Sequence, residues 1–212
     1  MGGTLAAAAL MLVVMSFTGV AAAAAPCPDE DLVPDSGNAP RVEAAVLCAI
    51  NRERAAAGRV TLTRSPKLDL SARFHTVTMV REHFLAHEAA GHPSLLARVR
   101  GYGYFAGARD GIYAENVGAG PTTNGTARAM IDAWMQSATH RLNLLHPPFR
   151  NVGISAVPAG PDPAFFADYP STVYTTDFGT RYVRRRCIRR RTTSTRTGGA
   201  TPRRRYCRPA RR

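Results

Sequence analysis

Hydrophobic residues recur at helical spacing in the first half of the chain. After Pro40, the apolar residues Val42, Val46 and Ile50 follow one another at intervals of four. This spacing places them on one face of an amphipathic helix, and Gly58 marks its end. The pattern therefore predicts that the folded part of the chain begins with a helix.

Three further helices are predicted from periodicity and from the residues at their ends. Ser65 is a natural N-cap for the second helix, and Pro66 fits its first turn. The third helix is short and ends at Gly101. The fourth lies in the stretch TTNGTARAMIDAWM, where Thr123 or Asn124 is the expected cap. All four helices are expected before residue 140.

Three stretches have the composition of β-strands. GIYAENVGAG (111–120) is a short β-like run, and NVGISAV (151–157) and STVYTTDFG (171–179) are rich in β-branched and aromatic residues. Each is bounded by Gly, Pro or Asn. Helices come first and two of the strands come last, which favours an α+β domain with antiparallel strands over a βαβ arrangement.

The N-terminal end predicts export from the cell. Residues 1–25 are apolar and small, and the run AAAAA before Pro26 offers several Ala-x-Ala cleavage sites, as in a secretory signal peptide. A membrane anchor is the alternative, because the apolar run is almost long enough to span a bilayer. Residues 26–40, rich in Pro and Asp, are expected to form an N-terminal arm.

Four cysteines also suit an oxidising compartment. They fall near the two ends of the mature chain, Cys27 with Cys48 and Cys187 with Cys207. Four cysteines allow three connectivities, so this pairing is one of three that stay open. A Cys27–Cys48 bond would join the arm to the first helix and would contribute about 3 kcal/mol in the chain-entropy treatment.

The net charge of +13 is concentrated at the C-terminal end. Fourteen of the 28 Lys and Arg residues lie from Arg181 onward, whereas all 15 Asp and Glu residues precede it. Residues 181–212 are therefore predicted to be an Arg-rich disordered tail. Such a tail contacts polyanions, namely an anionic membrane or cell-wall polymer or, without specificity, nucleic acid. The alternative is a solvated tail that has no partner.

Two polar residues occur where apolar ones are expected. His75 shares one face of the second helix with Leu68, Ala72 and Met79, so its ring should point inward. A hydrogen-bonded core histidine is the alternative to a role in a site. Glu115 lies in a weakly polar strand and needs a partner if it is buried, because an unpaired buried charge costs several kcal/mol.

His87, Glu115 and His140 together supply the donor types that zinc-like divalent ions prefer. Their separations are long, however, and no HExxH or other short ligand motif is present. Ser137 and His140 are three residues apart and can touch on a helix. As a nucleophile and base they lack an orienting group and an evident oxyanion site.

Four stretches resemble, in order, the motifs of a bacterial CAP domain. They are NRERAAAGRVTLTRSPKLDLSARFHTVTMVREHFLAH, GYGYFAGARDGIYAENVGAG, AWMQSATHRLNLLHPPFRNVGISAV and VYTTDFG. This is the SCP domain of the cysteine-rich secretory, antigen-5 and pathogenesis-related proteins. The similarity covers about residues 41–179, and a domain is expected over 41–180. It implies a three-layer α-β-α sandwich with an antiparallel central sheet.

The resemblance also implies roles for individual residues. Glu115 matches the glutamate of the family's Gly-Glu-Asn motif, with Ala114 in place of Gly, and His87 matches the histidine that precedes it. Ser137 stands where many members have a second glutamate. The family's second histidine, which would fall near Val173, is absent.

A cleft is the expected setting for these residues. His140 matches the bacterial Ser-x-x-His-Arg-x-Asn pattern, although with Arg141 it would also suit a helix C-terminus. The cleft set implied by the resemblance is His75, His87, Glu115, Trp134, Ser137 and His140. A divalent cation such as zinc on His87, Glu115 and His140 would be held weakly, because one carboxylate has been lost. No other cofactor is expected.

Three functions are compatible with the predicted domain, cleft residues and tail. The first is a secreted, monomeric, non-enzymatic module that binds a lipid, sterol or other envelope ligand, with its tail on an anionic surface. The alternative is a metal-assisted hydrolase of peptide or phosphodiester bonds, with Glu115 as a ligand or general base. The third is a structural envelope protein whose polar cluster only satisfies itself.

Overall fold

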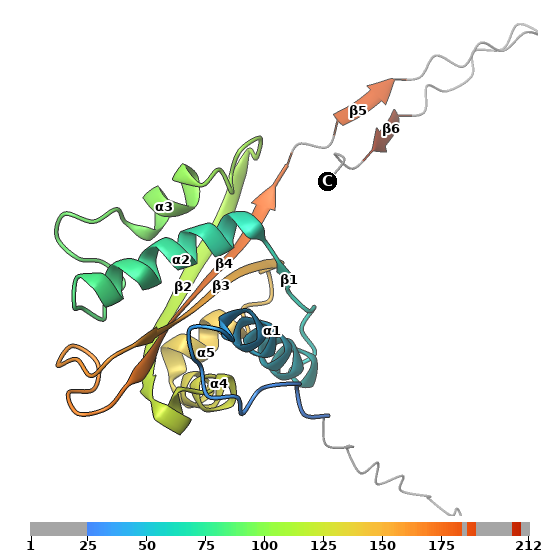
Figure 1. Ribbon diagram of the computed structural model, residues 1–212. Coiled ribbons are helices and arrows are strands. Elements are labelled where there is room, and N and C mark those ends of the chain that lie inside the picture. Colours follow the sequence, from blue (N-terminus) through green and yellow to red (C-terminus); the bar gives the residue numbers. More distant parts are fainter. Residues whose placement is uncertain (1–24, 184–185, 190–204, 209–212) are drawn as a thin grey trace, which may run out of the picture.

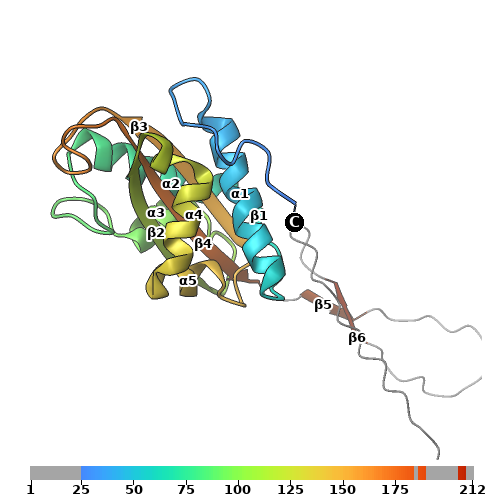
Figure 2. The same cartoon turned by 90° about the horizontal axis from the view of Figure 1, so that it is seen from below.

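The computed structural model describes residues 25–183, 186–189 and 205–208. Its main body has three layers, with α2 and α3 on one face of a four-stranded sheet and α1, α4 and α5 on the other (Figures 1 and 2). The helices are α1 Ala39–Ala56, α2 Pro66–Arg81, α3 Leu95–Gly101, α4 Ala127–Gln136 and α5 Ala138–Leu144. The strands are β1 Thr63–Arg64, β2 Asp110–Pro121, β3 Asn151–Ala159 and β4 Ser171–Tyr182.

The four expected helices and three expected strands are all present, with one change at a helix start. The cap of α4 is Thr126, whose hydroxyl accepts a hydrogen bond from the backbone N–H of Ala129 at 3.2 Å. The expected caps, Thr123 and Asn124, belong instead to a 3₁₀ turn, Thr122–Gly125. This turn takes the chain from β2 into α4.

The three-layer sandwich is confirmed, but the sheet is mixed and not antiparallel throughout. The strand order is β1-β3-β4-β2, and both neighbours of β4 run antiparallel to it. β1 pairs in parallel with β3 through only two residues before the chain enters α2. A strand of two residues shows no alternation, so the sequence pattern could not reveal this parallel edge.

The central strand β4 supplies most of the contact between the layers. Every residue from Ser171 to Thr180 is buried. On the α2 side, the Thr76 hydroxyl donates to the Thr175 hydroxyl at 2.8 Å. Because β2 and β4 are paired along their whole length, Glu115 of β2 stands directly opposite Asp177 of β4.

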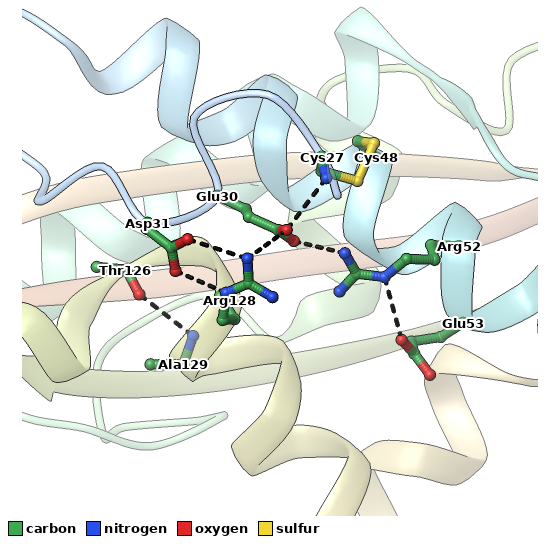
Figure 3. Close-up of polar contacts among 9 residues, drawn as sticks. All are labelled: Cys27, Glu30, Asp31, Cys48, Arg52, Glu53, Thr126, Arg128 and Ala129. Carbon is green, nitrogen blue, oxygen red and sulfur yellow. Dashed lines mark hydrogen bonds and ion pairs between the residues drawn. A yellow bond between two sulfur atoms is a disulfide. The ribbon is translucent and has the colours of Figure 1, made fainter. Parts of the chain in front are cut away.

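Figure 3 shows how the N-terminal arm is fastened to the α1 and α4 layer. The Cys27–Cys48 disulfide, one of the expected pairings, joins the arm to α1. Glu30 is 2% exposed and accepts hydrogen bonds from Arg52 of α1 at 2.6 Å and Arg128 of α4 at 2.5 Å. The arm therefore carries a buried carboxylate with two guanidinium partners, and its position is tied to both helices.

Two of the expected segments are only partly described. Residues 1–24, the greater part of the expected signal peptide, lie outside the described residues. In the tail, β5 Arg186–Arg189 pairs antiparallel with β6 Arg205–Arg208, and Cys187 stands opposite Cys207 in that register. A bond between these two cysteines stays a prediction. No helix in the described part of the chain has the length and apolar character needed to cross a bilayer.

The close packing of α2 on β3 gives a test of the fold. A Cβ added to Gly153 would lie 2.0 Å from the carbonyl carbon of Leu68 and 2.3 Å from its oxygen. We expect Gly153→Ala to lower the free energy of unfolding by at least about 1–3 kcal/mol, because a backbone would have to move. Gly101→Ala, where a Cβ meets nothing within 4 Å, should change it by no more than about 0.5 kcal/mol. Denaturant unfolding measures both, and equal stabilities would contradict this packing.

Candidate functional site

Glu115 lies at the centre of a buried polar cluster on the α2 and α3 side of the sheet. Its side chain is 1% exposed. The Nδ1–H of His87 donates to Oε1 at 3.0 Å, and Nε2 of His75 lies 3.8 Å from the same oxygen. The guanidinium of Arg98 donates to Oε2 through Nη2. The carboxylate therefore has a donor at each oxygen.

Each partner of Glu115 comes from a different element. His75 projects inward from α2 as expected, is 2% exposed, and donates through Nε2 to the Ala86 carbonyl at 2.9 Å. His87 follows α2 in the connection to α3. Arg98 belongs to α3, and its Nη1 also donates to the Pro93 carbonyl at 3.0 Å. The carboxylate thus joins β2 to both helices of this layer.

The contacts fix the charges in the cluster. Burial alone would raise the pKa of Glu115, but the hydrogen bond from His87 and the charge of Arg98 outweigh it and hold the pKa below its usual value. The same hydrogen bond raises the pKa of His87, whereas burial lowers the pKa of His75. Glu115 is therefore ionised, His75 is neutral, and His87 is the ring that gains a proton more readily.

Asp177 and Arg98 belong to the cluster, although neither was identified from the sequence as a site residue. Asp177 is completely buried, and burial together with the charge of Glu115 raises its pKa well above the usual range. Among the described residues, neither carboxyl oxygen of Asp177 has a hydrogen-bond partner. A protonated Asp177 can instead donate to an acceptor, and Glu115 is the residue opposite it.

The remaining expected cleft residues form a second group around α4 and α5. Trp134 is buried, stacks on His140 with ring centroids 6.1 Å apart, and donates to the Val117 carbonyl at 3.3 Å. Nδ1 of His140 lies 2.9 Å from the Ser137 hydroxyl, which confirms that these two side chains touch. Burial lowers the pKa of His140, and the charge of His87 adds to this effect.

The two groups meet the edge strand β2 from opposite faces. Asn116, the residue after Glu115, donates to the His140 carbonyl at 3.1 Å and accepts from Asn143 at 2.9 Å. Successive side chains of a strand point to opposite faces, so Glu115 faces α2 and α3 while Asn116 faces α5. No carboxylate oxygen of the described residues lies within 4.0 Å of the His140 ring. The structure brings together His75, His87 and Glu115, and it places His140 apart from that carboxylate.

This arrangement does not fit a divalent cation on Glu115. Across residues 25–183, no three His, Cys, Asp or Glu side chains converge as a ligand set. Oε2 of Glu115 is already in contact with a guanidinium, and Oε1 accepts from His87. A metal ion at either oxygen would have to displace a positive or hydrogen-bonded group, and it would lie beside the Arg98 charge.

A cavity opens beside this cluster. It has a volume of about 510 Å³, and its wall combines His87 and Glu115 with Leu95, Leu96 and Tyr113. A second cavity of about 580 Å³ lies further along β2 towards Gly111 and shares Leu96 and Tyr113 with the first. Both volumes fall in the range of small-molecule sites. Because they share two wall residues, the cavities are neighbouring parts of one groove between α3 and β2.

The family follows from a comparison with sequence models of known families. Residues 47–175 match the model of the cysteine-rich secretory protein family, CAP, over more than half of the chain. The chain belongs to the CAP family. A comparison with curated proteins finds no match for this CAP protein.

Solved structures with a similar fold come from three bacteria. An outer surface protein of Borrelia burgdorferi has a TM-score of 0.52 and 15% identity, with 70% of this chain and 97% of that chain covered. An extracellular SCP-domain protein of Bacillus anthracis has a TM-score of 0.49 and 20% identity, with 68% of this chain covered. A cysteine-rich secretory protein of Staphylococcus aureus has a TM-score of 0.44 and 18% identity, with 66% of this chain covered. This CAP protein spans only 40% of each of those two. Because all three identities are 20% or lower, these similarities show a shared fold and give no information about a shared function.

The ion pair predicts a large difference between two arginines of α3. Arg98→Met removes the guanidinium from a buried carboxylate, so the free energy of unfolding should fall by about 3–5 kcal/mol. Arg100→Met, two residues later at an exposed position, should change it by no more than about 0.5 kcal/mol. Adding Glu115→Gln to Arg98→Met should restore part of the loss, because the charge left behind is removed. Equal effects of the two arginine substitutions in urea unfolding would show that the buried pair does not stabilise the fold.

Proposed function

We propose that this protein is a secreted, non-enzymatic CAP module that binds an apolar or amphipathic envelope ligand of the lipid or sterol class in the groove between α3 and β2. The observation that carries the proposal is the pair of neighbouring cavities, which share the apolar wall of Leu96 and Tyr113 and have polar groups at both ends, His87 in one cavity and Arg100 and Arg109 in the other. Export is supported by the N-terminal sequence and by the similar structure from Borrelia burgdorferi, which is described as an outer surface protein.

His87 is the residue best placed to contact a polar group of the ligand. Its side chain is 54% exposed and lines the cavity, while its Nδ1 is held by Glu115. The bond to Glu115 orients the ring and leaves Nε2 directed away from the carboxylate. A ligand hydroxyl or head group can therefore form a hydrogen bond with Nε2 while its apolar part lies against Leu96 and Tyr113.

The contacts of the cluster support binding more than catalysis. Glu115 would have to act as a general base or metal ligand in the hydrolase alternative, yet both of its oxygens are engaged and Arg98 neutralises its charge. Among the residues that the structure describes, no carboxylate lies within ion-pair distance of His140 to orient the ring of the Ser137–His140 pair. No contact of the described residues favours hydrolysis.

A substitution that fills the groove tests this proposal. Leu96→Trp should weaken the binding of a fluorescent sterol or fluorescent fatty acid at least about 10-fold, equivalent to about 1.4 kcal/mol, because the indole occupies the shared part of the two cavities. Leu142→Trp is the matched control, since Leu142 is 71% exposed on α5, in the other layer. The measurement is a fluorescence titration of each variant. Equal affinities of the two variants, or no binding by the unmodified protein, would refute the groove as the ligand site.

The Arg-rich tail is proposed to hold the module at an anionic surface. Arg181 and Tyr182 belong to β4, and the Arg181 guanidinium lies 5.5 Å from the centre of the Tyr104 ring. A truncation that preserves the sheet should therefore end after Val183. We expect this truncation to abolish retention on anionic vesicles or cell walls at low ionic strength, where screening is weakest. Co-sedimentation measures retention, and an unchanged bound fraction would rule out anchoring by the tail.

A further inference from the structure

The outer face of α2 exposes three large apolar side chains. Leu70, Phe74 and Val77 follow the i, i+4, i+7 pattern of one helix face and are 51%, 38% and 38% exposed. The opposite face of the same helix is fully buried against the sheet through Leu68, Ala72 and Met79. A helix that lies on a sheet needs only one apolar face, so the outer row is not explained by the core.

The row continues to the end of the neighbouring helix α3 and is flanked by positive charge. The Phe74 ring lies 6.3 Å from the ring of Tyr102, which follows α3. Three exposed basic side chains of α2, namely Lys67, Arg73 and Arg81, lie on the same helix face as this row. We call the row of Leu70, Phe74, Val77 and Tyr102 with these three cations the α2–α3 face.

The acidic residues of this region are already paired. Asp69 accepts from Arg64 at 2.9 Å, and Glu82 accepts from Arg81 at 2.9 Å. In the described part of the chain, neither Lys67 nor Arg73 forms an ion pair with an acid. The α2–α3 face therefore combines apolar side chains with a net positive charge.

The tail leaves the sheet at the end where α2 begins. Thr63, just before α2, is in register with Asn151 of β3, and Asn151 with Gly179 of β4. Gly179 precedes Arg181 by two residues, so the N-terminal end of α2 and the start of the tail lie at the same end of the sheet (Figure 1). Arg181 also stacks on Tyr104, which packs with Leu68 of α2.

We infer that the α2–α3 face docks on an anionic lipid bilayer. The helix α2 would lie along the surface, with Leu70, Phe74 and Val77 entering the boundary between headgroups and acyl chains and the basic side chains meeting lipid phosphates. Charge complementarity and the adjoining Arg-rich tail favour a bilayer over a protein partner. The inference extends the proposed anchoring by the tail, because it adds an apolar contact that salt does not screen.

The first experiment measures vesicle binding of the full chain. Phosphatidylcholine vesicles with and without phosphatidylglycerol are used at about 0.15 M and about 1 M salt, where the screening length falls from about 8 to about 3 Å. We expect the Leu70→Ser/Phe74→Ser/Val77→Ser variant to lose at least about 10-fold in affinity at the higher salt, where apolar insertion dominates. The matched control replaces three apolar residues elsewhere on the surface by Ser. These are Val33, Val60 and Leu142, which are 44%, 58% and 71% exposed.

A second experiment reports insertion without removing the apolar row. The chain contains one Trp, and this residue, Trp134, is buried. Phe74→Trp should therefore give a blue-shifted emission and quenching by brominated lipid on anionic vesicles, whereas Leu142→Trp should give neither. This variant keeps an aromatic ring at position 74, so it remains informative if the triple Ser variant fails to fold.

The outcomes separate the α2–α3 face from the tail. Equal vesicle affinities of the two triple variants, or no emission change for Phe74→Trp on vesicles that bind the protein, would overturn the inference and leave anchoring by the tail intact. Self-association that is lost in the Leu70→Ser/Phe74→Ser/Val77→Ser variant, with unchanged vesicle binding, would make the face a protein interface and also overturn it. Blue-shifted emission in a chain that ends after Val183 would support the face while excluding a need for the tail.

Discussion

The buried Glu115 carboxylate is the constraint around which one layer of this protein is arranged. An ionised acid with 1% exposure requires donors at both oxygens, and the fold supplies them from two places along the chain, His87 and Arg98. Arg98 is the decisive partner because its guanidinium joins Glu115 to the Pro93 carbonyl. The seven-residue α3 has little stability of its own, so these bonds help to hold it against β2 and to shape the groove.

In the layer of α1, α4 and α5, a buried charge is stabilised by backbone carbonyl groups. Arg54 of α1 is completely buried and has no carboxylate partner among its hydrogen bonds. It donates to the backbone carbonyls of Val60 at 2.8 Å, Leu144 at 2.7 Å and Phe149 at 3.3 Å. Carbonyl groups at the end of α5 and in the loop before β3 thereby gain a charged donor, which fixes the chain that follows His140.

Sequence patterns predicted the elements well because each long element contains its own signal. α1 and α2 have apolar residues at helical spacing, and β3 and β4 have β-branched runs, so local periodicity was sufficient. The inward orientation of His75 and the requirement of Glu115 for a partner followed from the same reasoning. The identity of that partner did not, since Arg98 reaches Glu115 only through the tertiary placement of α3. Asp177 could have been found, because it too is an acid in a predicted strand, 171–179, whose other residues are neutral.

His140 illustrates the limit of inferring a site from a shared motif. Its spacing from Ser137 correctly indicated contact within one short helix, but spacing contains no information about which face of β2 that helix covers. The alternation of side chains along β2 determines which layer each residue faces. Asn116 contacts α5, so the adjacent Glu115 faces the layer of α2 and α3. The His140 ring therefore lies beyond 4.0 Å of the Glu115 carboxylate, while the charge of His87 still lowers its pKa.

The two layers have different tasks in the function we propose. The layer of α1, α4 and α5 contains the disulfide, the buried Glu30 cluster and Arg54, which all fasten chain segments to one another. The layer of α2 and α3 borders the groove and carries the outer apolar row, and α3 contributes Leu96 and Arg100 to the wall of the groove. The α3 helix contacts both α2 and β2, so it lies next to the proposed docking face as well as the groove. Docking and ligand binding would then depend on the same short helix, and through it on the Arg98–Glu115 pair.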